Sequence, residues 1–210
     1  MLDIIYQDES IVVCVKPFRV LSTDEPGGMP DRIREAIGQP QAKVRTVHRL
    51  DRPVGGVMVY ARTQDAAAKL SAQMQSEAFG KEYLAVLDGA PEPVEGELHD
   101  LLFFDRQKGK SYAVRRKRAG VKDARLTYRV LAQAEGLTLV RVRLFTGRTH
   151  QIRVQFSHAG YPLAGDAKYG AKEKGSLALC AHHLELKHPR TGKRLSFTVK
   201  PEGEIFHSFV

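Results

Sequence analysis

Short apolar runs separated by turn residues are the feature that most limits how this chain can fold. Side chains of a strand point to alternate faces, so residues 138–144 have one apolar face and carry Arg141 and Arg143 on the other. Glu135 and Gly136 lie just before this run and predict a turn that joins it to a strand over residues 126–131. The pattern predicts an antiparallel sheet with one buried face and one basic face.

Strand and helix periodicities predict the remaining elements. Strands are expected at residues 4–6, 11–15, 57–60, 81–87, 177–186 and 194–199. Helices are expected at residues 30–37, from Thr63 or Gln64 to residue 79, and at residues 148–159. In the second helix, the buried side is marked by Ala66, Leu70, Met74 and Ala78. The predicted fold class is α+β, with a mixed, mainly antiparallel central sheet and flanking helices.

Length and composition are compatible with one substantial core or two small fused lobes, since 42% of the 210 residues are hydrophobic. Every apolar run is far shorter than the roughly 18 residues of a membrane helix. Residues 1–5 lack the basic and apolar character of a secretory leader, so we expect a cytoplasmic protein without a membrane partner. Cys14 and Cys180 lack metal-ligand spacing and are interpreted as small buried hydrophobic residues.

Positive charge is concentrated in one segment. The net charge is +9, and residues 106–125 contain nine basic residues and one acidic residue. A basic segment that also contains glycines and Tyr112 predicts contact with a polyanion such as RNA. We expect Arg115, Arg116 and Arg118 to bind phosphate groups of the RNA. The alternative is a solvated loop whose charge serves solubility.

A single carboxylate lies among cations in the sequence His48-Arg49-Leu50-Asp51-Arg52. Neighbouring positive charge favours the ionised form of a carboxyl group, so Asp51 is a candidate nucleophile or general base. The alternative is a surface cluster of ion pairs at the start of a strand. A second cluster, at residues 147–153, favours a functional role for the first.

Four segments resemble signature sequences of the RluA family of pseudouridine synthases. They are His48-Arg49-Leu50-Asp51-Arg52, Lys81-Glu82-Tyr83-Leu84-Ala85, Gly147-Arg148-Thr149-His150-Gln151-Ile152-Arg153 and Gly165-Asp166-Ala167-Lys168-Tyr169-Gly170. The similarity extends from about Tyr6 to Phe197. The resemblance implies the α+β pseudouridine synthase fold and an enzyme that isomerises uridine to pseudouridine in RNA.

Three positions depart from the family's pattern. Pro53-Val54-Gly55-Gly56 stands where relatives usually have Asp-Thr-Ser-Gly. Gln155 stands where a histidine is common, and Cys180 where a histidine often precedes alanine. None of these departures removes a predicted catalytic group, but they bear on which RNA is the substrate.

The resemblance implies a catalytic site of three residues. Asp51 is then the catalytic aspartate, Arg153 the arginine that pairs with it, and Tyr83 the tyrosine that packs on the target base. A planar guanidinium suits bidentate contact with a carboxylate, and an aromatic ring suits a uracil. The alternative role of Tyr83 is core packing. Isomerisation needs no redox change and no external group, so no cofactor is expected.

The resemblance implies further contacts with the substrate. Arg49 would fill the space that opens when the target base is flipped out of its stack, and Leu179 would close the pocket. The alternative role of Arg49 is a structural salt bridge. Arg148 and His150 could contact phosphate, and their segment also fits a hydrogen-bonded helix start.

We expect residues 1–210 to form a single catalytic domain, without a separate N-terminal RNA-binding domain, that acts as a monomer. Ribosomal RNA is favoured slightly over transfer RNA as the substrate. A non-catalytic RNA-binding protein or RNA chaperone of the same fold is the alternative, although binding alone has no use for Asp51, Tyr83 and Arg153 together.

A hydrolase that uses Asp51, such as a nuclease or glycosidase, would require paired carboxylates or a metal ion. The sequence shows no paired carboxylates of this kind. His182, His183 and His188 lack acidic or cysteine companions at ligand spacing, so no metal site is predicted.

Overall fold

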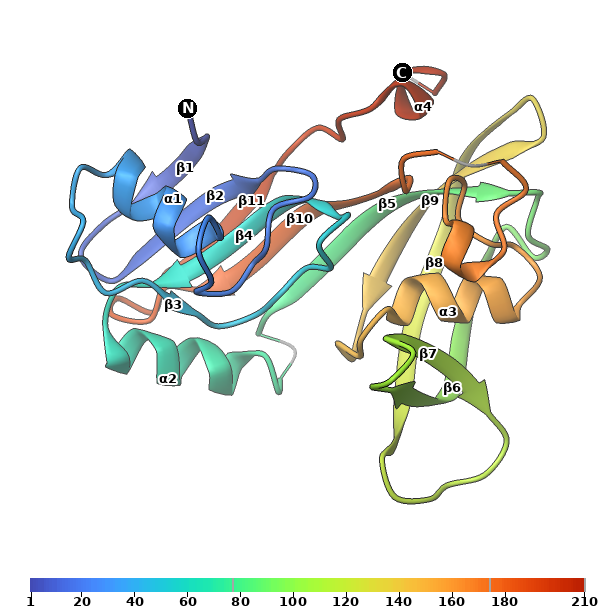
Figure 1. Ribbon diagram of the computed structural model, residues 1–210, viewed down its shortest axis with the longest axis horizontal. Helices are drawn as coiled ribbons and strands as arrows, with labels where there is room; N and C mark the ends of the chain where they lie inside the picture. The colour runs from blue at the N-terminus through green and yellow to red at the C-terminus, as the bar shows by residue number, and fades with distance from the viewer. Residues whose placement is uncertain (77, 174, 210) are drawn as a thin grey trace. The chain divides into compact units, whose positions relative to one another are not determined.

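The computed structural model describes residues 1–76, 78–173 and 175–209, which form two compact units. Unit 1 consists of Met1–Lys81 and Ala181–Pro201, and unit 2 consists of Glu82–Cys180 and the C-terminal residues from Glu202 onward. The chain passes between the units inside two strands, β5 (Gly80–Asp88) and β10 (Leu179–Lys187). The elements of each unit are labelled in Figure 1.

Unit 1 is a sheet with two helices. Its strands follow the order β1-β2-β4-β10, where β1 is Ile4–Gln7, β2 is Ile11–Lys16 and β4 is Gly55–Ala61. The short strand β3 (Arg45–Thr46) pairs with β4, and β11 (Arg194–Thr198) pairs with β10. The helices are α1 (Met29–Ala36) and α2 (Gln64–Gln73), and α2 lies along β3 and β4 (Figure 1).

The core of unit 1 forms because β2 and β4 are nearly continuous apolar runs. Val13 and Val59 are register partners and are fully buried. They pack with Ala66 and Leu70, which α2 presents on one side at four-residue spacing. Burying each large aliphatic side chain contributes about 1.5–3 kcal/mol to the free energy of unfolding. Thr63 caps α2, since its hydroxyl accepts the N–H of Ala66 at 3.1 Å.

The prediction that α2 continues to residue 79 is wrong, because the helix ends at Gln73. The side chain of Gln73 binds the backbone of Lys187, donating to its carbonyl at 2.7 Å and accepting its N–H at 2.8 Å. This contact attaches the end of the helix to β10. The chain then turns, and Phe79 reaches the core from outside any helix.

Unit 2 is an antiparallel sheet with the strand order β5-β9-β8-β6-β7. Its further strands are β6 (Glu95–Asp105), β7 (Lys110–Val114), β8 (Val121–Ala134) and β9 (Leu137–Leu144). Its helices are α3 (Gln151–His158), the 3-10 turn η1 (Ala167–Tyr169) and α4 (Glu204–His207).

The strands in unit 2 differ from the predictions mainly in the basic segment. The turn at Glu135 and Gly136 is confirmed; both residues have positive φ, 52° and 79°, as a tight hairpin turn requires. β8 begins five residues before the predicted strand, and β6 and β7 were not predicted. Half of the segment at residues 106–125 is therefore sheet, with an exposed connection at residues 115–120.

The two faces of this sheet differ, because residues directly opposite each other on antiparallel strands point to the same face. Tyr83 is the partner of Val142, and Val142 is the partner of Tyr128. The ring of Tyr128 packs edge-on against Phe156 of α3 at 5.5 Å. Tyr83 therefore points to the face that α3 covers, whereas Arg141 and Arg143 point to the opposite face, as predicted from their alternation.

Helix α3 begins at Gln151 and not at residue 148 as predicted. His150 adopts a left-handed conformation with φ of 55°, which interrupts the helix before that point. The side-chain carbonyl of Gln151 accepts the N–H of Arg148 at 3.0 Å and the hydroxyl of Thr146 at 2.8 Å. Residues 146–151 therefore form a hydrogen-bonded helix start, which was the alternative predicted for this segment.

Other expectations from the sequence are confirmed. The strands predicted at residues 4–6, 11–15, 57–60, 81–87, 177–186 and 194–199 and the helix at residues 30–37 are present, with ends shifted by at most two residues. Cys14 and Cys180 are buried, and burial raises the pKa of both thiols to about 12. Within the described residues, no helix combines the length and apolar character needed to cross a bilayer.

Gly56 permits the closest backbone approach in unit 1. It has φ of 123°, and a Cβ atom built on it would lie 2.2 Å from the carbonyl oxygen of Ala181 in β10. Because the obstacle is backbone, the two strands would have to separate to admit a methyl group. This glycine is the one position of Pro53-Val54-Gly55-Gly56 at which the chain agrees with the family's usual sequence.

We predict that Gly56→Ala lowers the free energy of unfolding by at least about 3 kcal/mol, measured by urea denaturation. Gly38→Ala is the matched control, since Gly38 also has positive φ (65°) but no atom lies within 4 Å of its added Cβ. We expect that variant to lose only about 1–2 kcal/mol. Equal losses in the two variants would contradict the role assigned to the β4–β10 contact.

Candidate active site and RNA-binding surface

Asp51 lies in unit 1, in the loop that leads from β3 to β4, and is partly exposed. The backbone before it is held by Ser22, whose hydroxyl donates to the carbonyl of Leu50 at 2.9 Å and accepts its N–H at 3.1 Å. The backbone after it turns, with the N–H of Val54 donating to the carbonyl of Asp51 at 2.9 Å. Both flanks of Asp51 are therefore fixed by hydrogen bonds to the main chain.

Lys16 is a functional candidate that sequence reasoning missed. It ends β2, is fully buried, and donates to the carbonyls of Val20 at 2.7 Å, Pro17 at 3.0 Å and Arg52 at 3.3 Å. Burial lowers the pKa of Lys16 to about 8, and the charge of Asp51 opposes this shift. The only signal in the sequence is a lysine that directly follows the apolar run at residues 11–15.

The remaining residues of the first signature have separate structural environments. Nε2 of His48 accepts the N–H of Val59 at 3.1 Å, and the ring packs edge-on against Phe79 at 5.6 Å. Burial, with a smaller contribution from the charge of Lys81, lowers the pKa of His48 to about 3, so this imidazole is neutral at pH 7. Arg49 is exposed, and its roles in RNA contact or in a salt bridge stay predictions.

In unit 2, Arg153 of α3 forms a buried bidentate ion pair with Asp166. Its Nε lies 2.6 Å from Oδ2 of Asp166, and its Nη2 lies 2.8 Å from Oδ1. Both side chains are less than a tenth exposed. The guanidinium carbon also lies 5.0 Å from the centre of the Tyr169 ring. The pair fixes the guanidinium in position and orientation.

Asp166 and Tyr169 are site residues that sequence reasoning undervalued. Both lie in the signature segment at residues 165–170, in which no single residue was predicted to have a catalytic or substrate-binding role. The Tyr169 hydroxyl accepts the N–H of Ser111 at 2.8 Å and lies 2.8 Å from Nδ1 of His150. Burial raises the pKa of Tyr169 to about 12, so the hydroxyl keeps its proton and can donate it to His150.

Two of the three predicted catalytic residues belong to unit 2. Tyr83 is buried and points to the face of the sheet that is covered by α3, the helix that carries Arg153. Asp51 belongs to unit 1, and its pairing with Arg153 stays a prediction. Leu179, the predicted pocket-closing residue, is buried at the start of β10.

The predicted RNA-binding residues of unit 2 lie in and near the basic segment. Nε of Arg148 donates to the carbonyl of Asp123 at 2.8 Å, and the ring of His150 packs edge-on against Phe104. Arg115, Arg116 and Arg118 are exposed on the connection between β7 and β8. The guanidinium of Arg118 lies 5.0 Å from the Phe103 ring. Their contact with RNA stays a prediction.

Gln155, which departs from the family's pattern, and the histidines considered as metal ligands all have structural contacts. Gln155 of α3 is fully buried and donates to the carboxylate of Asp100 at 2.8 Å, attaching the helix to β6. His182 contacts the carbonyl of Val199, and His188 contacts the carboxylate of Asp8 at 2.7 Å. Among the described residues, no three His, Cys, Asp or Glu side chains gather as a metal site requires.

Residues 10–158 match the sequence model of the RNA pseudouridylate synthase family. The chain belongs to this family. It is a pseudouridine synthase, which is an isomerase that acts on RNA, and the predicted resemblance is confirmed. Family membership also favours the catalytic interpretation over a non-catalytic RNA-binding protein or chaperone.

Several relatives of this pseudouridine synthase match most of its length. Ribosomal large subunit pseudouridine synthase D of Pseudomonas aeruginosa is 35% identical over 93% of this chain and 67% of its own. The dual-specificity RNA pseudouridine synthase RluA of Salmonella typhi is 34% identical over 94% and 92%, and tRNA pseudouridine synthase C of Yersinia pestis is 33% identical over 95% and 86%.

A solved structure supports the fold assignment of the pseudouridine synthase. Human RNA pseudouridylate synthase domain containing 4 superposes with a TM-score of 0.81 at 24% identity, covering 99% of this chain and 91% of that chain. The predicted α+β pseudouridine synthase fold is therefore confirmed.

We predict that Asp166→Asn lowers the free energy of unfolding by about 3–5 kcal/mol, because it leaves the Arg153 guanidinium buried without its anionic partner. Urea denaturation checks this value. Asp65→Asn is the matched control, since it removes the same charge from an exposed pair with Lys69 on α2. That variant should lose less than about 0.5 kcal/mol. Similar losses of unfolding free energy in both variants would show that the buried Arg153–Asp166 pair contributes no more to stability than the exposed Asp65–Lys69 pair.

The pKa of Lys16 predicts a pH dependence of stability. The ordinary value is 10.5, and burial lowers it to about 8 in the folded protein. Between pH 8 and 10.5 the unfolded chain binds more protons, so the contribution of Lys16 to the free energy of unfolding rises with pH, by at most about 1.4 kcal/mol per pH unit. Below pH 8 both states are protonated and this contribution is constant.

We expect urea denaturation to show that the free energy of unfolding rises less between pH 7 and pH 10 in Lys16→Met than in the unmodified chain. Lys81, whose pKa is also lowered by burial, contributes equally to both proteins and cancels in the difference. Parallel curves for the two proteins would contradict the lowered pKa.

Proposed function

We propose that this enzyme isomerises specific uridines in structured RNA with Asp51 as the catalytic carboxylate, Arg153 as its partner and Tyr83 as the stacking surface for the base. The observation that carries the proposal is the buried Arg153–Asp166 pair, which fixes a guanidinium on the sheet face to which Tyr83 points. Such a guanidinium is prepared to bind a second carboxylate without reorganisation. The match of residues 48–52 to the family's signature and the family membership of the chain support Asp51 for that carboxylate.

The reaction sets simple requirements for these groups. The bond from N1 of uracil to C1′ of ribose breaks, the base turns, and a bond from C5 to C1′ forms. The proton on C5 leaves, and N1 gains one, so atoms and charge balance without a redox partner. Asp51 serves either by attacking C1′ or by removing a proton from the neighbouring ribose carbon.

Each remaining group has a role in holding the substrate. Tyr83 would hold the detached uracil by stacking, which contributes about 1–3 kcal/mol per base. Arg49 would fill the space left by the extruded nucleotide, and Leu179 would close the pocket. Arg115, Arg116, Arg118, Arg148 and His150 would contact the phosphate backbone, which makes binding strongly salt-dependent.

We propose ribosomal RNA as the substrate in preference to transfer RNA. The relatives include proteins named for the ribosomal large subunit, one named for transfer RNA and one named as dual in specificity. Members of the family thus differ in the class of RNA for which they are named. We further propose that residues 1–210 act as one cytoplasmic, monomeric catalytic domain that needs no cofactor.

Asp51→Asn tests the proposal. Uridine tritiated at C5 releases its label when C5 becomes bound to ribose, so release from a tritiated, unmodified ribosomal RNA transcript measures the reaction. We expect Asp51→Asn to abolish release while RNA binding, measured by filter retention, is retained. Asp65→Asn, an exposed acid of α2, is the control with the same chemical change.

Activity of Asp51→Asn equal to that of the control would overturn the catalytic assignment. Carbodiimide-dependent reverse-transcription stops on cellular RNA, compared with and without the gene, identify the uridine. Stops confined to transfer RNA would overturn the preference for ribosomal RNA and leave the assignment of Asp51 standing.

A further inference from the structure

A cavity of about 300 Å³ lies in unit 2 between the basic segment and the start of the signature segment at residues 147–153. Its lining residues are Leu102, Phe104, Arg106, Ser111, Gly120, Lys122, Gly147, Arg148 and Thr149. They come from β6, β7 and β8, from the connections that precede β7 and β8, and from the loop that precedes α3. The volume is at the lower end of the range of small-molecule pockets, about 300–1,000 Å³.

The cavity is lined by three cations and no acid. These are Arg106, Lys122 and Arg148. The two nearest acids in the sequence are engaged elsewhere. The carboxylate of Asp105 accepts the N–H groups of its own turn, and that of Asp123 lies 3.2 Å from Nζ of Lys117. In the described part of the chain, none of the three cations forms an ion pair with a carboxylate.

An aromatic ring lies beside these cations. Phe104 is 37% exposed and lines the cavity. Its ring is held edge-on against His150, at 6.2 Å and 88°, and His150 in turn contacts the Tyr169 hydroxyl. The ring is therefore fixed in orientation, with part of its surface free for another aromatic group.

The position of the cavity relates it to catalysis. Leu102 is the register partner of Lys122, and Leu102 packs with Val154 of α3, so Lys122 points to the face of the sheet that α3 covers. Tyr83 points to this same face. The cavity is therefore on the side of unit 2 that carries the proposed catalytic residues.

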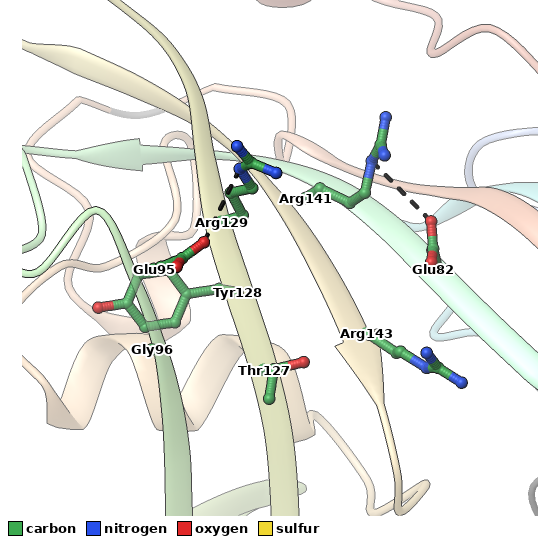
Figure 2. A pocket seen from close by; sticks show the side chains of 8 residues that line it. All are labelled: Glu82, Glu95, Gly96, Thr127, Tyr128, Arg129, Arg141 and Arg143. Carbon is green, nitrogen blue, oxygen red and sulfur yellow. Dashed lines mark ion pairs between the residues drawn. The ribbon is translucent and has the colours of Figure 1, made fainter.

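A second cavity of about 450 Å³ lies on the opposite face, and glutamates neutralise most of the positive charge of its wall (Figure 2). It is lined by Arg129, Arg141 and Arg143, together with Glu82 and Glu95. Arg141 lies 3.9 Å from Glu82 and Arg129 lies 3.9 Å from Glu95. Two of its three arginines thus have carboxylate partners, which would repel phosphate. This surface provides matched control residues.

We propose that the first cavity binds a nucleotide of the RNA next to the target uridine, with Arg106, Lys122 and Arg148 around its phosphate and Phe104 against its base. Three cations without carboxylate partners attract an anionic phosphate, and an exposed ring suits a base of any identity. The inference rests on the proposed function, since it places the flanking nucleotide relative to the same reaction.

Binding of a fluorescein-labelled oligouridylate, followed by anisotropy at several salt concentrations, tests the proposal. Lys122→Gln and Arg106→Gln should each raise Kd about tenfold. Each should also lower the slope of log Kd against log salt by about 0.7, the value for one phosphate of a single strand. Phe104→Leu should raise Kd at least about fivefold and leave the salt slope unchanged.

The control variants are Arg129→Gln and Arg141→Gln, which remove equal charge from the second cavity. They should bind oligouridylate like the unmodified chain. All five positions are exposed, so melting temperatures should agree within about 2 °C and confirm that every variant is folded. Equal weakening in the cavity and control variants would mean that only overall charge matters, and would overturn the proposal.

The tritium-release assay separates this inference from the proposed function. In Lys122→Gln and Phe104→Leu, KM for the ribosomal RNA transcript should rise by a larger factor than kcat falls. An active enzyme whose cavity variants keep the original Kd and KM would overturn the nucleotide site and leave the function standing. Weakened binding in the cavity variants of a chain that releases no tritium would leave the site standing and overturn the function.

Discussion

The buried ion pair between Arg153 and Asp166 is the interaction on which the candidate site in unit 2 depends. Removing two charges from water costs several kcal/mol per ion, and only good geometry with additional contacts offsets that cost. The two short bonds and the Tyr169 ring under the guanidinium provide both. Because α3 and η1 must both be in place to form the pair, the position of the guanidinium is coupled to the folding of the unit.

Unit 1 positions Asp51 by a different means, since it fixes the main chain and leaves the carboxylate partly exposed. Ser22 binds the backbone of Leu50, and Lys16 binds the carbonyl of Arg52. A fully buried ammonium that donates to three carbonyls adds positive potential near Asp51. The carboxylate can then serve as nucleophile or base, the two roles that the chemistry leaves open.

The sheet of unit 2 separates its charges by face. On the side that α3 covers, Arg106, Lys122 and Arg148 line a cavity that has no acid in its wall. On the other side, Arg129 and Arg141 lie beside glutamates. Side-chain alternation along β8 contributes to this division, because it places Lys122 and Arg129 on opposite faces of the sheet. A net charge of +9 alone does not distinguish the two faces.

Most strands, the hairpin turn at Glu135 and Gly136 and the mainly antiparallel α+β class could be predicted from the sequence alone, because periodicity and turn chemistry are local properties of the backbone. The signature segments indicated the family. Four other features were set by the tertiary structure: the end of α2 at Gln73, the Arg153–Asp166 pair, the burial of Lys16 beside the Asp51 loop, and the cavity shared by Arg106, Lys122 and Arg148. These features depend on which distant segments are brought into contact, and the free energy of burying or pairing a charge is set by those contacts.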